Sequence, residues 1–60
     1  MEWMEINCVI AGLEALITKY QSELQAEGLS EDDHADLSSD MGYAEILLGK
    51  YSELRDKMRG

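Results

Sequence analysis

Glu31 and His34 are the first pair of side chains in this sequence whose spacing fits a chemical role. They lie three residues apart, the spacing by which one helix of a di-iron carboxylate bundle presents two ligands on one face. Glu23 or Glu27 could approach them from a preceding helix. However, His34 is the only histidine, and the pair falls near the end of a hairpin. We therefore interpret it as a solvated helix start, keep a carboxylate metal-binding bundle as the weakest alternative, and expect no metal site and no cofactor.

Asp32, Asp36 and Asp40 form a ladder of carboxylates spaced by four residues. Hard cations such as calcium and magnesium prefer oxygen ligands of this kind. The surrounding sequence lacks the loop that makes such sites tight, and like charges at this spacing repel by roughly 0.2–0.5 kcal/mol per pair. The ladder therefore predicts weak cation binding at most.

Cys8 is the only cysteine, which excludes an intramolecular disulfide. No histidine or acyl-transfer motif surrounds it, and a thiol without an activating partner behaves as a small apolar side chain. The sequence also lacks a glycine-rich phosphate loop, and a single helical hairpin offers no deep pocket. We therefore predict that the protein is not an enzyme.

The stretch from Leu24 to Asp33 predicts the corner between the two helices that must position these side chains. Gly28 can adopt the left-handed conformation that follows a helix end, with Leu24 and Leu29 as the apolar pair of that end. Ser30 can cap a second helix, because its hydroxyl can accept from an amide of the first turn. The pattern predicts a single domain over residues 1–60, with a helix over about 2–27, a turn over 28–30 and a helix over about 31–59.

The predicted fold class is all-α, an antiparallel helical hairpin, because so short a connection brings two helices side by side. Each helix carries an apolar seam with steps of three and four residues. A chain of 60 residues in two helices cannot enclose a core. We therefore expect self-association into a four-helix bundle or a larger helical oligomer. The residues of the oligomer seam are Trp3, Ile6, Ile10, Leu13, Ile17, Tyr20, Leu24, Leu37, Met41, Ala44, Leu48 and Tyr51.

The predicted corner also fixes which side chains face one another across the hairpin. Folding at Leu29 sets Ile10 near Leu48 in the middle of the rod. The same register sets Trp3 near Leu54 and Arg55 at the open end.

Small or flexible residues recur at helical spacing away from the seam, and they predict a possible second interface. Two glycines seven residues apart on one stripe allow another backbone to approach closely, although glycine in a helix costs about 1 kcal/mol relative to alanine. The alternative is that these residues are ordinary surface positions. The residues of this second stripe are Met4, Cys8, Ala11, Ala15, Gly42, Ile46 and Gly49.

Acidic residues gather after the corner, in numbers that exceed what helix capping requires. No Lys or Arg occurs between residues 31 and 45, and the net charge of the chain is −8. This charge argues against binding to nucleic acid or to anionic lipid, and it favours a partner protein with a basic surface. The alternative is that these charges only match the helix dipole and keep the protein soluble. The partner-binding residues expected at this acidic end are Glu31, Asp32, Asp33, Asp36 and Asp40.

The longest apolar-rich stretch, Ile6–Ile17, is too short for a membrane span and includes Asn7 and Glu14. Glu2 and other early acidic residues are not typical of a signal peptide. The lone thiol is compatible with a reducing compartment. We therefore expect a cytoplasmic protein without a membrane partner.

Taken together, the patterns predict a small, acidic, non-enzymatic protein-interaction module, acting as an adaptor or inhibitor. Its size and charge suit a phage or mobile-element accessory protein that acts on a host protein. The alternative is a structural or assembly subunit whose oligomer is the functional unit, with any small ligand held between protomers.

Overall fold

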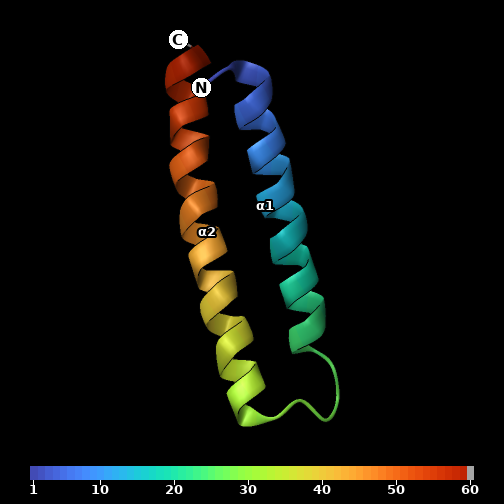
Figure 1. The fold of residues 1–60 in the computed structure, drawn as a ribbon. Coiled ribbons are helices and arrows are strands. Elements are labelled where there is room, and N and C mark those ends of the chain that lie inside the picture. Colours follow the sequence, from blue (N-terminus) through green and yellow to red (C-terminus); the bar gives the residue numbers. More distant parts are fainter. Residues whose placement is uncertain (60) are drawn as a thin grey trace.

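A computed structural model describes residues 1–59 and shows two helices, α1 (Trp3–Leu24) and α2 (Glu31–Arg59), packed antiparallel as a hairpin (Figure 1). These residues contain no strand, so the described chain is all-α, as the apolar seams predicted. The hairpin is a rod with extents of 46 × 14 × 13 Å. The start of α1 and the end of α2 lie together at one end of the rod, which we call the open end; the opposite end is the turn end.

The buried core of the hairpin is small. Ile6 and Ile10 are 0% and 3% exposed, and Ala44 of α2 is 3% exposed; no other residue of the described chain is buried. Ile6 and Ile10 are four residues apart and therefore lie one above the other on the face of α1 that meets α2. Burying one such side chain stabilises a fold by roughly 1.5–3 kcal/mol, so this core is slight for a chain of 60 residues.

The corner is longer than the sequence predicted, because α1 ends at Leu24 rather than near residue 27. The amides of Gln25 and Ala26 donate to the carbonyls of Ser22 and Glu23, which are three residues earlier, and these tighter bonds close the helix. Gly28 does adopt positive φ, at 79°, but it lies within the connection rather than directly after the helix. The prediction of its conformation is confirmed, and the prediction of its position relative to the helix end was wrong.

The start of α2 follows the prediction from the sequence. The backbone N–H of Asp33 donates to Oγ of Ser30 at 3.1 Å, and the N–H of His34 donates to the carbonyl of Ser30 at 2.9 Å. Ser30 is therefore the N-cap of α2. Glu31, Asp32 and Asp33 occupy the first turn, where the helix dipole favours negative charge.

The longer corner changes the register of the two helices near the open end. The guanidinium of Arg55 donates to Oδ1 of Asn7 at 3.2 Å, and Cζ of Arg59 lies 5.9 Å from the centre of the Trp3 ring. The register predicted from the sequence set Trp3 beside Leu54 and Arg55. Arg55 contacts Asn7 instead, one helical turn further along α1, and a longer connection accounts for this shift.

Neither helix is long and apolar enough to cross a membrane, within the residues that the structure describes.

Candidate functional site

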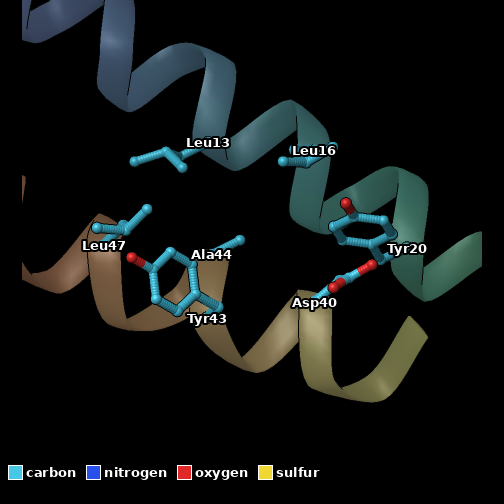
Figure 2. A pocket seen from close by; sticks show the side chains of 7 residues that line it. All are labelled: Leu13, Leu16, Tyr20, Asp40, Tyr43, Ala44 and Leu47. Carbon is cyan, nitrogen blue, oxygen red and sulfur yellow. The ribbon is translucent and has the colours of Figure 1, made fainter. Parts of the chain in front are cut away.

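Three hollows lie in a row along one face of the hairpin, which we call the groove face. The middle hollow has a volume of about 260 Å³ and lies between the two helices. Figure 2 shows that Leu13, Leu16 and Tyr20 reach it from α1, while four side chains reach it from α2. The four from α2 are Asp40, Tyr43, Ala44 and Leu47. Its wall is mainly apolar, and the Asp40 carboxylate lies beside the Tyr20 ring on the side towards the turn.

The hollow at the turn end combines apolar and acidic side chains. It has a volume of about 380 Å³. Ala26 and Leu29 of the corner, together with Leu37 of α2, supply its apolar part. Three carboxylates complete the lining: Glu23, Asp33 and Asp36. An apolar side chain followed by a cation would satisfy both parts of this lining.

The hollow at the open end has the opposite charge character. It has a volume of about 490 Å³, and it brings Lys50 and Lys57 together with one carboxylate, that of Glu53. Met1 and Leu54 supply apolar surface, being 60% and 39% exposed. Tyr51 completes the lining.

One stripe of α2 links the three hollows, and we call it the groove stripe. Its members step by three and four residues, so each lies on the same side of the helix as the next, and the stripe winds slowly around α2. From the turn end to the open end it carries three carboxylates, then an apolar centre, then two lysines separated by a leucine. At 1.5 Å per residue the stripe is about 36 Å long. Its residues are Asp33, Asp36, Asp40, Tyr43, Leu47, Lys50, Leu54 and Lys57.

The structure places the predicted seam residues between the helices to different degrees. Ile6, Ile10 and Ala44 are buried. Trp3 is 41% exposed, and the guanidinium of Arg59 lies over its ring at the open end. The remaining seam residues are half-buried, and they are Leu13, Ile17, Tyr20, Leu24, Leu37, Met41, Leu48 and Tyr51.

The second stripe of the sequence lies on two separate surfaces. Cys8 is two residues from both Ile6 and Ile10, so it lies about 200° around α1 from the buried face. By the same spacing, Ile46 points away from α1 on the far side of α2, where it is 69% exposed. Met4 is 81% exposed, Cys8, Ala11, Ala15 and Gly49 are exposed, and Gly42 is half-buried. A partner that covered one half of the stripe would therefore not cover the other half.

The acidic end divides into two groups in the structure. All five predicted residues are exposed. Asp33, Asp36 and Asp40 line hollows of the groove face, whereas Glu31 and Asp32 line none of these hollows. Among residues 1–59, no three His, Cys, Asp or Glu side chains are gathered in a way that could hold a metal ion. Within residues 1–59 of a single chain, Glu31 and His34 therefore have no third ligand beside them.

Arg55 makes a polar contact between the helices that the sequence analysis missed. It donates to Asn7 and is only partly exposed, and its Nε is buried without an acceptor in the described part of the chain. The available signal was Asn7, a polar residue inside the apolar first half of α1. The hydrogen bond joins the two helices near the open end, in addition to the small apolar core.

No known protein family, no curated protein and no solved structure matches this chain. We therefore infer the function from the geometry of the chain itself. The hairpin has one face with a row of hollows, acidic at the turn end and with two lysines at the open end. The second stripe lies on two other surfaces, one on α1 and one on α2.

Proposed function

We propose that this protein is a small, non-enzymatic protein-interaction module, an adaptor or inhibitor that acts on another protein. The observation that carries the proposal is the groove stripe, a row of carboxylates, apolar side chains and lysines along α2 that is exposed except at the half-buried Leu47. Small-molecule sites are concave and enclose their ligand. A row of shallow hollows along a stripe about 36 Å long offers little enclosure but suits a helix or another extended protein surface.

The acidic turn end is the part of the module that we assign to a partner with a basic surface. Residues 17–43 hold seven of the thirteen acidic residues and only one of the five Lys and Arg residues. Such a charge concentration steers a basic partner and disfavours nucleic acid and anionic membranes. Glu31 and Asp32 are exposed and lie outside the three hollows, so they remain accessible even when the groove is covered. We propose that it is a phage or mobile-element accessory protein that acts in the host cytoplasm.

An assembly subunit, whose oligomer is itself the functional unit, is the second candidate. The small core favours it, because only three side chains of the described hairpin are buried. Short chains usually need an additional source of stability, and self-association supplies one. A four-helix bundle or a larger helical oligomer would provide it.

Removal of two charges at the tip tests the adaptor role. The variant is Glu31→Gln with Asp32→Asn, and the matched control is Glu2→Gln with Asp56→Asn, which removes two charges at the open end. Each protein is used to capture partners from a lysate of its native host, at low and at raised salt. We expect the wild type and the control to retain one partner that elutes with salt, and the tip variant to lose it.

Two outcomes would contradict this role of the acidic end. Equal capture by the tip variant and the control would show that the tip does not bind the partner. A defined oligomer that captures no partner at either salt concentration would favour the assembly subunit instead.

A further inference from the structure

We propose that the groove face binds a second copy of this chain, antiparallel to the first, about a two-fold axis that passes between the two α2 helices at the level of residue 45. This inference deepens the proposed function and rests on it, because it names the first partner of the interaction module and the surface that binds it. The observation that carries it is the order of side chains along the groove stripe. That order is complementary to itself when it is reversed.

The charges of the stripe select the antiparallel orientation. Its turn end carries Asp33, Asp36 and Asp40, and its open end carries Lys50 and Lys57. Two stripes in parallel would place like charges opposite one another, which is destabilising. Two antiparallel stripes place Asp33 and Asp40 of each copy opposite Lys57 and Lys50 of the other.

The spacing of the stripe also fixes the position of the axis. Asp33 and Lys57 lie twelve residues on either side of residue 45, and Asp40 and Lys50 lie five residues on either side of it. One two-fold axis at this level therefore pairs both sets of charges, twice each, across the interface. Such a contact is isologous and closed, so it ends at a dimer.

The same axis matches the apolar parts of the groove. Tyr43 and Leu47 lie two residues on either side of it, so the 66% exposed Tyr43 ring of each copy meets Leu47 of the other over the middle hollow. Leu54, 39% exposed, falls opposite Asp36. It is thereby directed into the turn-end hollow beside Leu29 and Leu37 of the second copy.

The face is large enough for a specific interface. The two longer extents of the rod, 46 and 14 Å, give a footprint of about 640 Å² on each copy and about 1,300 Å² in total. Specific protein interfaces usually bury at least about 1,200 Å².

Charge exchange between the two ends of the stripe tests the pairing. One variant is Asp33→Lys with Asp40→Lys, and the other is Lys50→Asp with Lys57→Asp. Sedimentation velocity should show a dimer for the wild type. For each variant alone the dimer dissociation constant should be at least about tenfold higher, because like charges of the two copies then face one another. An equimolar mixture of the two variants should restore the dimer.

A control with the same change of charge separates the stripe from the helix as a whole. Glu31→Lys with Glu45→Lys lies on α2 but outside the groove stripe, and it should leave the dimer intact. A wild-type monomer at high concentration, variants that dimerise normally, or a mixture that stays monomeric would overturn the proposal. A stable dimer that captures no host protein would instead leave the dimer standing and contradict the adaptor role.

Distances between spin labels test the orientation without disturbing the charges of the stripe. In a Cys8→Ser background, single labels are attached through Glu45→Cys or Asp56→Cys. In an antiparallel dimer, the two labels at position 45 lie at almost the same level along the rod. The two labels at position 56 lie about 33 Å apart along the rod. Equal distances at the two positions would show a parallel dimer and overturn the proposal, even if a charge-exchange variant failed to fold.

Discussion

The terminal half of the hairpin, residues 1–16 with 44–59, and the turn half, residues 17–43, are held together in different ways. The terminal half contains all three buried side chains of the described chain, together with the Asn7–Arg55 hydrogen bond and the Trp3–Arg59 contact between the helices. In the turn half the side-chain polar contacts are local, as in the Ser30 cap of α2. Packing between the helices thus holds the terminal half together. The turn half is held by the covalent connection between the helices and by local polar contacts.

Charge sharpens the difference between the two halves. The turn half holds seven of the thirteen acidic residues against Lys19, whose ion pair with Glu23 is long, at 4.0 Å, and exposed. Exposed pairs of this kind contribute little, typically below about 1 kcal/mol. Because the turn half has few buried contacts and much like charge, local opening should begin there rather than at the open end.

Ile10→Asp should have the largest effect, because it places an unpaired charge in the packed half. The 3% exposed site offers no partner for the carboxylate, so we expect a loss of roughly 3–5 kcal/mol in the free energy of unfolding. Urea unfolding followed by circular dichroism measures it. Ile17→Asp in the turn half is the matched control, and its half-buried site should cost only roughly 1–2 kcal/mol. Equal losses at both sites would remove the distinction between the halves.

Gly28→Val tests the connection that holds the turn half. A β-branched residue resists the φ of 79° found there, so we expect a loss of roughly 1–2 kcal/mol in the free energy of unfolding. Gly12→Ala is the control, because Gly12 is helical and a Cβ there meets no atom within 4 Å. It should raise stability by about 1 kcal/mol. Two substitutions of the same sign would show that the corner conformation is wrongly assigned.

Gly49→Ala tests whether the far side of α2 is an interface in the terminal half. A Cβ at this exposed position meets nothing within 4 Å, so alanine should stabilise the isolated helix by about 1 kcal/mol. Thermal melting measures the gain, and sedimentation at several concentrations measures association. A rise in melting temperature without loss of association would mean that Gly49 is ordinary surface. A loss of association would restore the second stripe as an interface.

Ser30→Ala should have the smallest and most local effect. It removes the oxygen that accepts from the Asp33 amide at 3.1 Å, at a cost of about 1 kcal/mol. Hydrogen exchange should quicken at Asp33 and His34, while amides near Ile6 and Ile10 remain protected. Equal acceleration at both ends of the rod would mean that the hairpin opens only as a whole.

The sequence predicted the helices, the cap and the antiparallel hairpin because each depends on local patterns. Steps of three and four residues mark a helix face, and Ser30 before three acids marks a helix start. The end of α1 was not predictable in the same way. Gln25, Ala26 and Glu27 carry no apolar face whose loss would mark a boundary, and Gly28 shows where φ is positive but not how far back the helix ended.

The groove was harder to predict than the seam because it depends on register. Asp33, Asp36 and Asp40 were recognised as an acidic group, but the sequence analysis assigned Lys50 and Lys57 no role. Their common face with Tyr43 follows from the three- and four-residue steps, which the sequence contains. The length of the connection decides which side chains of α1 line the hollows. The sequence analysis underestimated that length.

The common location of the start of α1 and the end of α2 has a consequence for joining two copies into one polypeptide (Figure 1). In the proposed antiparallel pair, the open ends lie at opposite ends of the assembly, about 46 Å apart along the rod. A linker between tandem copies must therefore contain at least about 14 residues, at roughly 3.3 Å per extended residue. A linker of about five residues reaches only about 17 Å and restricts the copies to a parallel arrangement. The length of the linker in a tandem fusion therefore determines whether the two copies can pair antiparallel.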